Sequence, residues 1–284
     1  MGIKGRLTVM NFLQFFIWGS WMMTLAHYGF VEKQWNGAEF GLVFSTMGFA
    51  SLIMPTLFGI IADKWRANYV FALLHLMFGI AMCFLPFVDA PIPFFWVLLV
   101  AMCFYMPTIG LNNSVGFSIL KNEGKDPTSA FPPIRVWGTV GFIAAMWVTN
   151  LFTKDWGFGQ SIKISFFIAA GSAFLLSAYS FIMIPSVKRE AKANDGAKRT
   201  LVQKLGLEAF VLFKQKKMAL FFVFSLMLGA ALQLTNAYGD SFLQDDTVFP
   251  KGGIINNFST IILSISQISE TLFILAIPFF MKRF

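Results

Sequence analysis

Long apolar segments alternate with short polar segments along almost the whole chain. Each apolar segment approaches the ~20 residues that a helix needs to cross the ~30 Å hydrocarbon core of a membrane. The polar segments stay short through the first two thirds of the chain, where one longer polar segment follows. The pattern predicts eight membrane-spanning helices, at residues 8–28, 38–62, 69–87, 94–118, 131–153, 162–184, 219–243 and 256–280.

The composition agrees with this pattern. Hydrophobic residues make up 57% of the 284 residues and charged residues only 13%, whereas soluble domains carry about 25% charged residues. The sequence therefore predicts an all-α polytopic membrane protein. The first apolar run is too long for a signal peptide and lacks a small-residue cleavage site, so we expect no cleaved leader.

The positive charges are distributed unevenly over the polar segments. The formal net charge is +8, and most Lys and Arg residues fall on one side of the membrane when the N-terminus is placed in the cytoplasm. This asymmetry is the positive-inside rule, and it predicts a cytoplasmic N-terminus. We interpret the basic segment 186–217 as a loop that meets anionic lipid, because it lacks a motif for nucleic-acid recognition.

The order of the segments predicts the domain organisation. Residues 1–184 form a six-helix bundle, 185–217 a cytoplasmic connector, and 218–284 the first two helices of a second bundle. Six spans, a basic connector and further spans are typical of transporters built from two six-helix halves. On this interpretation the second half is cut short after the eighth helix, and four spans are lacking.

A glycine and charged residues stand between the second and third predicted spans. The segment GIIADKWR, residues 59–66, resembles the loop signature of the major facilitator superfamily, with Trp65 where the family commonly has glycine. The resemblance implies that this loop stabilises one conformation of a transport cycle and does not bind substrate. An ordinary basic turn is the alternative. The predicted motif residues are Gly59, Asp63, Lys64 and Arg66.

The fifth predicted span places a cation, a hydroxyl and an aromatic ring on one face. Arg135, Thr139 and Phe142 are spaced at i, i+4 and i+7, so a helix brings them to the same side. Such a face suits a polar ligand with an aromatic part. The alternative is that Arg135, which is near the start of the helix, extends to the membrane interface.

The seventh and eighth spans also carry polar side chains at helical spacing. Gln233 and Asn236 lie at i and i+3, and so do Gln267 and Glu270. A carboxylate in a span costs at least ~2.5–3.5 kcal/mol, so Glu270 is expected to face a bundle interior or a water-filled cavity. The amides can instead link helices. We expect Asp240, near the end of its span, to lie at the interface.

The other reactive or polar residues within the spans are interpreted mainly as packing residues. Cys83 and Cys103 lie inside spans and are interpreted as small apolar residues. Gln14, the WGSW segment 18–21 and Asn112 are interpreted as residues that pack or link helices, with ligand contact in a cavity as the alternative. His75 is interpreted as a residue satisfied within the bundle. The sequence contains no catalytic triad, nucleotide-binding loop or metal-binding cluster, so we expect neither an enzyme nor a cofactor.

Several segments together resemble one family. They are NFLQFFIWGSW, GIIADKW, YMPTIGL, FPPIRVWGTVGF, LGAALQLTNAYGDSFL and SISQISETLFILAIPFF. They resemble the NupG/XapB-type nucleoside:proton symporters of the major facilitator superfamily, and the resemblance covers essentially the whole chain. It implies proton-coupled import of nucleosides across a bacterial inner membrane by alternating access, with nucleoside and protons as partners. From the sequence itself we expect contact with lipid and none with nucleic acid, and a monomer, although the sequence does not fix the oligomeric state.

The resemblance also implies roles for the polar faces. Arg135, Thr139 and Phe142 correspond to cavity residues, with Phe142 stacking on the base. Gln233 and Asn236 correspond to amides that read the base or ribose. Gln267 and Glu270 correspond to the polar pair of the eighth span, and Glu270 is also the candidate for proton coupling. Family members use further residues from a tenth span, which this chain lacks.

Two other functions remain as alternatives. A sugar:proton symporter of the same fold would also suit an arginine followed by glycines in the fifth span. A membrane protein that binds ligand without transporting it would suit a chain with an incomplete second half.

Overall fold

The computed structural model describes residues 2–153, 161–186 and 212–283. Its long helices are α1 (Ile3–Gly19), α3 (Gly37–Lys64), α4 (Ala67–Phe84), α5 (Pro91–Asn122), α7 (Pro132–Thr153), α8 (Lys163–Met183), α10 (Lys216–Leu243) and α12 (Ser259–Arg283). Short elements are α2 (Leu25–His27), the π-helix η1 (Tyr28–Glu32), the 3-10 helix η2 (Leu85–Phe87), α6 (Pro127–Ala130) and α11 (Ile254–Asn257). No strand occurs among the described residues, as predicted.

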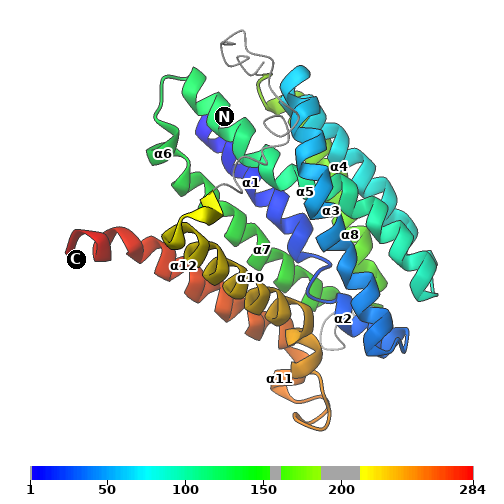
Figure 1. The fold of residues 1–284 in the computed structure, drawn as a ribbon. Coiled ribbons are helices and arrows are strands. Elements are labelled where there is room, and N and C mark those ends of the chain that lie inside the picture. Colours follow the sequence, from blue (N-terminus) through cyan, green and yellow to red (C-terminus); the bar gives the residue numbers. More distant parts are fainter. Residues whose placement is uncertain (1, 154–160, 187–211, 284) are drawn as a thin grey trace.

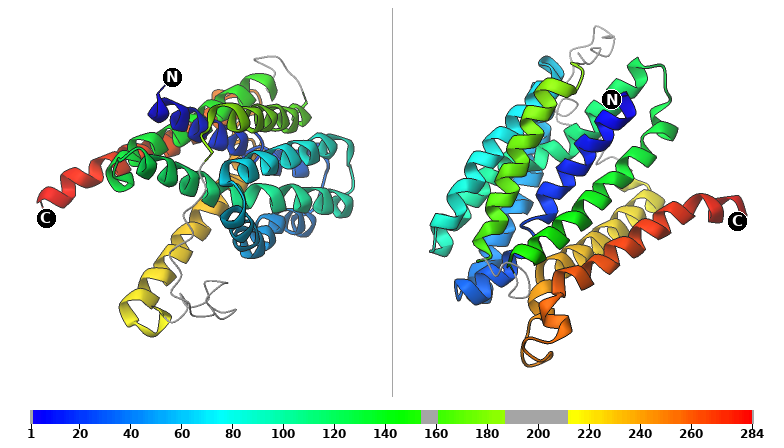
Figure 2. Two further views of the ribbon diagram at one scale, coloured as in Figure 1. Left: turned by 90° about the horizontal axis from the view of Figure 1, so that it is seen from above. Right: turned by 180° about the vertical axis from the view of Figure 1, so that it is seen from behind.

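The first six long helices form one bundle (Figure 1). Within it α1 packs mainly on α7, α3 on α5, and α4 on both α5 and α8. Helices α10 and α12 contact each other, and α12 also lies along α7 (Figure 2). Successive long helices are antiparallel. We call the end of the bundle where α1 begins the N-terminal side, and the opposite end the α11 side.

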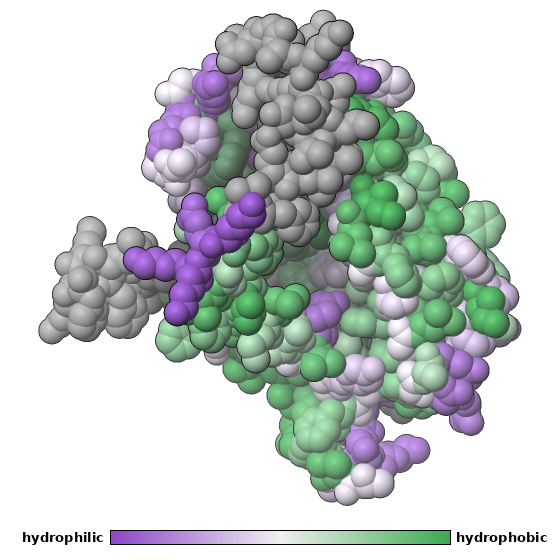
Figure 3. All heavy atoms as spheres, in the orientation of Figure 1, coloured by the Kyte–Doolittle hydropathy of each residue, from purple (hydrophilic) through white to green (hydrophobic). Residues whose placement is uncertain are grey.

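Within the described ranges, six helices are long and apolar enough to cross a membrane: α3, α4 with η2, α5, α6 with α7, α8 and α10. They coincide, within a few residues, with six of the eight predicted spans. Their outer surfaces are apolar, as shown by Leu52, Phe87 and Ile182, which are each more than 75% exposed. Figure 3 shows these apolar sides in green. Exposed apolar surface of this extent fits a protein surrounded by lipid.

The first predicted span, 8–28, is wrong as a continuous helix. Helix α1 begins at Ile3 and ends at Gly19, and a turn at residues 20–24 separates it from α2 and η1. Two hydroxyls mark the break, because Ser20 donates to the Ile17 carbonyl at 2.9 Å and Thr24 donates to the Trp21 carbonyl at 3.1 Å. Such local side-chain bonds compete with the bonds of a regular helix.

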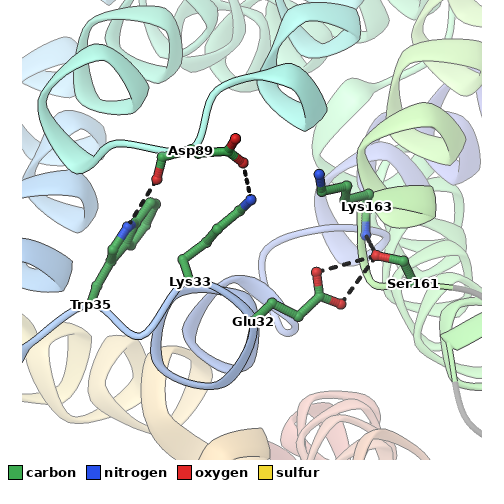
Figure 4. Close-up of polar contacts among 6 residues, drawn as sticks. All are labelled: Glu32, Lys33, Trp35, Asp89, Ser161 and Lys163. Atoms are coloured by element: carbon green, nitrogen blue, oxygen red, sulfur yellow. Dashed lines mark hydrogen bonds and ion pairs between the residues drawn. The ribbon is translucent and has the colours of Figure 1, made fainter.

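Polar contacts hold the segment after this break to the bundle (Figure 4). Glu32 accepts from the Ile162 backbone N–H at 2.8 Å, beside the start of α8. Lys33 forms an ion pair with Asp89, and that contact holds the pKa of the Asp89 carboxyl below its usual value. The Trp35 indole donates to the Asp89 carbonyl at 3.3 Å. The broken segment is therefore fixed between the starts of α5 and α8.

Glycines allow α1 and α7 to approach closely. A Cβ atom on Gly141 would lie 2.1 Å from the Phe12 carbonyl oxygen, and one on Gly19 would lie 2.7 Å from the Phe142 carbonyl oxygen. Both obstacles are backbone atoms, which cannot rotate away. Contacts of this kind through small residues are the usual basis of helix packing in membranes.

The predicted connector lies largely outside the described residues. The structure describes 185–186 and 212–217 of it, with Lys216 and Lys217 opening α10. The domain boundaries remain predictions. The predicted eighth span, 256–280, is shifted in the structure, because α11 ends at Asn257 and α12 begins at Ser259.

Candidate functional site

The six-helix bundle and the pair α10–α12 meet most closely at the α11 side. Trp147 of α7 donates to the Ser264 hydroxyl of α12 at 2.9 Å, and Thr260 donates to the Met146 carbonyl at 3.3 Å. Tyr238 of α10 packs on aromatic rings of the bundle near the helix break. These contacts close the α11 side.

Asp240 joins α10 to α12 at the α11 side. Its carboxylate accepts from the Ser259 hydroxyl and from the Gln244 amide, both at 2.6 Å, and the residue is only 1% exposed. The expected position at the membrane interface stays a prediction, and the structure adds that protein buries the side chain, because α12 begins directly against it. Its spacing of seven residues from Gln233, on the same face of α10, was the sequence signal for a buried position.

Toward the N-terminal side the two parts diverge. Figures 1 and 2 show the start of α10 and the end of α12 pointing away from α1 and α3. The hydrogen bonds between α7 and α12 given above lie in the α11-side halves of both helices. The molecule is therefore closed at the α11 side and opens toward the N-terminal side.

A cleft of about 410 Å³ lies between the two parts. It is lined by Trp18, Phe44, Ser45, Met47, Gly48, Ser51, Met106 and Gln233. One wall therefore comes from α1, α3 and α5, and Gln233 of α10 forms the other. The Gln233 amide donates to the Met47 sulfur at 3.7 Å, and a thioether is a weak acceptor. A ligand with a carbonyl oxygen would offer this amide a better partner.

The polar residues of α10 and α12 lie at similar depth. Gly239 of α10 packs on Leu263 of α12. Because the helices are antiparallel, Gln233, six residues before Gly239, is about level with Gln267 and Glu270. Gln267 and Glu270 also follow Leu263 at i+4 and i+7, so they share its face.

Arg135 and Glu270 approach each other from α7 and α12. The Arg135 guanidinium lies 3.9 Å from the centre of the Phe15 ring, and it interacts electrostatically with Glu270. No ion pair within 4.0 Å joins the two charges in the described part of the chain. Gly138 leaves room for this arrangement, because a Cβ there would lie 2.7 Å from the guanidinium. The Arg135 cation and the Glu270 carboxylate thus interact between α7 and α12 without a direct ion pair.

The remaining predicted residues are less accessible. Asn236 is 9% exposed, and its amide has no hydrogen bond to another described residue. Thr139 is partly exposed on α7. Phe142 is only 6% exposed and is covered by α1 at Gly19. Each assignment to a ligand stays a prediction. Phe142 packs between two helices in this conformation.

The predicted motif loop is at the N-terminal side. Gly59, Asp63 and Lys64 belong to the last part of α3, which ends at Lys64. The Arg66 guanidinium lies 5.5 Å from the centre of the Tyr69 ring. Asp63 lines a small crevice there, far along α3 from the cleft. The loop therefore does not line the cleft.

Buried polar side chains link α1 to α5. Gln14 donates to the Thr108 hydroxyl at 2.8 Å, and Asn112 donates to the Asn11 side chain at 2.8 Å. All four residues are fully buried. Their interpretation as residues that link helices agrees with this geometry.

Three comparisons place the chain among known proteins. A family described as nucleoside H+ symporter matches residues 1–284. The xanthosine permease of Escherichia coli (strain K12) is 46% identical over 287 residues, and the nucleoside permease NupG of the same organism is 44% identical over 290 residues. Each match covers 100% of this chain and 66% of the permease.

Solved structures agree with the sequence comparisons. The crystal structure of the nucleoside transporter NupG matches with a TM-score of 0.84 and 42% identity, covering 100% of this chain and 68% of that chain. A mutant form of NupG matches with a TM-score of 0.86, covering 69% of that chain. The chain thus spans about two thirds of the length of the proteins that it resembles.

Proposed function

The chain belongs to the nucleoside H+ symporter family, whose fold is that of the major facilitator transporters, and we propose that it imports nucleosides together with protons. The strongest support is the match over all 284 residues to a family of this description. The cleft between the two parts supports the same function, because it combines aromatic rings, an amide and, nearby, a cation and a carboxylate.

We propose that the N-terminal side faces the cytoplasm of a bacterial cell and that the protein lies in the inner membrane. The basic residues support this orientation through the positive-inside rule. The described conformation is then closed to the outside and open to the cytoplasm. Alternating access would require the contacts of Trp147, Thr260 and Tyr238 at the α11 side to separate.

Labelling a single cysteine tests this orientation. A membrane-impermeant maleimide added to intact cells should not label Ala193→Cys, because residues 186–217 would be cytoplasmic. It should label Lys251→Cys, on the opposite side. Strong labelling at position 193 with none at 251 would reverse the orientation.

The proposed ligand is recognised in two parts. A nucleoside combines a flat base with a neutral, hydroxylated ribose. The amides of Gln233, Asn236 and Gln267 can make directional hydrogen bonds to either part. The Glu270 carboxylate can accept from ribose hydroxyls when it is ionised, and it can carry a proton when it is not. Arg135 and Thr139 would complete the polar side of the site.

Uridine provides the direct test of the function. The purified chain in lipid nanodiscs should bind uridine, and glucose in excess should not compete. Competition by glucose would favour a sugar symporter of the same fold. Binding of neither compound would contradict the proposal.

Arg135→Lys tests whether the guanidinium acts in the site. Lysine keeps the positive charge but loses the planar group that rests on Phe15 and interacts with Glu270. We expect uridine affinity to fall at least fivefold, about 1 kcal/mol. The matched variant Arg6→Lys, at the N-terminal side of α1, should bind as the unchanged chain does. An affinity for Arg135→Lys within twofold of the unchanged chain would make Arg135 an interface anchor only.

A further inference from the structure

We propose that Trp18 is the aromatic wall against which the nucleobase packs. This inference rests on the proposed function and specifies the part of the site that holds the base. Trp18 ends α1 at the helix break, is partly exposed, and lines the cleft opposite Gln233. The cleft volume of about 410 Å³ falls within the range of about 300–1,000 Å³ that is typical of small-molecule sites.

The fold holds the Trp18 indole in place before any ligand arrives. Its ring is stacked on Tyr105 at 5.1 Å between centres and 9° between planes. Tyr105 is fully buried, and its hydroxyl donates to the Gln14 carbonyl at 2.6 Å. The buried Trp21 ring meets Trp18 nearly at a right angle, 5.5 Å away. A side chain that is already ordered loses little conformational entropy on binding.

The surroundings of Trp18 suit a flat heteroaromatic ring with carbonyl groups at its edge. Met47 and Met106 bring polarizable thioethers to the same cleft, and sulfur makes favourable contacts with aromatic rings. On the opposite wall the Gln233 amide donates to the Met47 sulfur and to no other residue in the described part of the chain. A base carbonyl is a stronger acceptor than a thioether and would replace that contact. A base between Trp18 and Gln233 would thus use an aromatic surface and a poorly used donor together.

The other aromatic rings of the site are less available. Phe142 is covered by α1 at Gly19. Phe44 lines the cleft, but it also packs against Phe40, with 5.6 Å between ring centres. The indole of Trp18 is also the largest ring in the cleft. Trp18 is therefore the residue expected to distinguish an aromatic base from a non-aromatic one.

The test compares uridine with 5,6-dihydrouridine, which keeps both carbonyls and the ribose but lacks an aromatic base. The purified chain should bind uridine at least tenfold more tightly than dihydrouridine. Trp18→Leu should weaken uridine binding about tenfold, as expected for the loss of an aromatic contact to a base, and change dihydrouridine binding less than twofold. Trp96→Leu, on an exposed lipid-facing tryptophan, is the matched control and should keep the full discrimination.

Two further variants make the outcome decisive. Trp18→Phe keeps a smaller ring on Tyr105 and should retain part of the discrimination, even if Trp18→Leu does not fold. Phe44→Leu should retain nearly all of it. The role of Trp18 would be overturned if the preference for uridine over dihydrouridine stayed unchanged in the Trp18 variants, or if only Phe44→Leu lost it. Either result would leave the proposed nucleoside binding standing. Failure of the unsubstituted chain to bind uridine would instead overturn the proposed function.

Discussion

Replacing Glu270 with glutamine is expected to weaken uridine binding about tenfold and to remove most of its dependence on pH. Glu270 is exposed on α12, and its carboxylate interacts electrostatically with Arg135 of α7. An ionised acceptor makes stronger hydrogen bonds than a neutral amide, and a tenfold change corresponds to about 1.4 kcal/mol. Glutamine keeps the size and the hydrogen-bonding capacity of the side chain but cannot exchange a proton.

Measurements of binding and of transport would distinguish the two roles proposed for Glu270, which are contact with the ribose and proton coupling. If it contacts the ribose, the Glu270→Gln variant loses affinity in a binding titration. If it only carries the coupled proton, affinity is kept while accumulation driven by a pH gradient is lost. We expect the first result, with proton coupling shared with other groups.

Glu123→Gln provides the control for this substitution. Glu123 is an exposed carboxylate at the end of α5 on the N-terminal side, away from the cleft. Its replacement should leave uridine affinity and its pH dependence unchanged. An unchanged affinity together with an unchanged pH dependence in Glu270→Gln would make Glu270 a structural residue of the bundle.

Among single glycine-to-alanine replacements in the six-helix bundle, Gly141→Ala is expected to cause the largest loss of stability. A Cβ at this position would lie 2.1 Å from the Phe12 carbonyl oxygen and 2.9 Å from its carbonyl carbon. Both atoms belong to the backbone of α1, so the helices must move apart. Overpacking of this kind typically costs about 1–3 kcal/mol, and the separation would also disturb Arg135, which rests on Phe15 of the same helix.

Thermal unfolding of the purified chain in one detergent measures this effect. Gly141→Ala should unfold several degrees below the unchanged chain. Gly171→Ala in α8 is the matched control, because nothing lies within 4 Å of the added Cβ, and it should unfold at the same temperature or slightly higher, since alanine favours a helix over glycine by about 1 kcal/mol. Equal unfolding temperatures for the two variants would show that α1 and α7 do not pack as described.

The spans were predictable because the membrane imposes a simple requirement. A helix that crosses hydrocarbon must be apolar over ~20 residues, and that pattern is visible residue by residue. The break after Gly19 was not predicted, because residues 20–28 are as apolar as a span requires. What interrupts the helix is the local bonding of Ser20 and Thr24 together with the distant contacts of Glu32 and Lys33.

The polar faces of the candidate site were also predictable, because helical spacing places Arg135 with Thr139 and Gln267 with Glu270 on shared faces. Spacing cannot tell which face meets another helix. Phe142 shares the face of Arg135, yet it is covered by α1, whereas Trp18, in a segment interpreted as packing, lines the cleft.

The sequence by itself determined the helical membrane fold, the positions of most spans and the polar residues of α7, α10 and α12, since these depend on hydrophobicity and helical period alone. Only the tertiary structure decided that Asp240 joins α10 to α12, that Arg135 interacts with Glu270, and that Trp18 and Gln233 form opposite walls of one cleft. Those relations depend on how closely two helices approach and how far each is rotated, and both are set by contacts such as that of Gly141 with Phe12 between residues far apart in the chain.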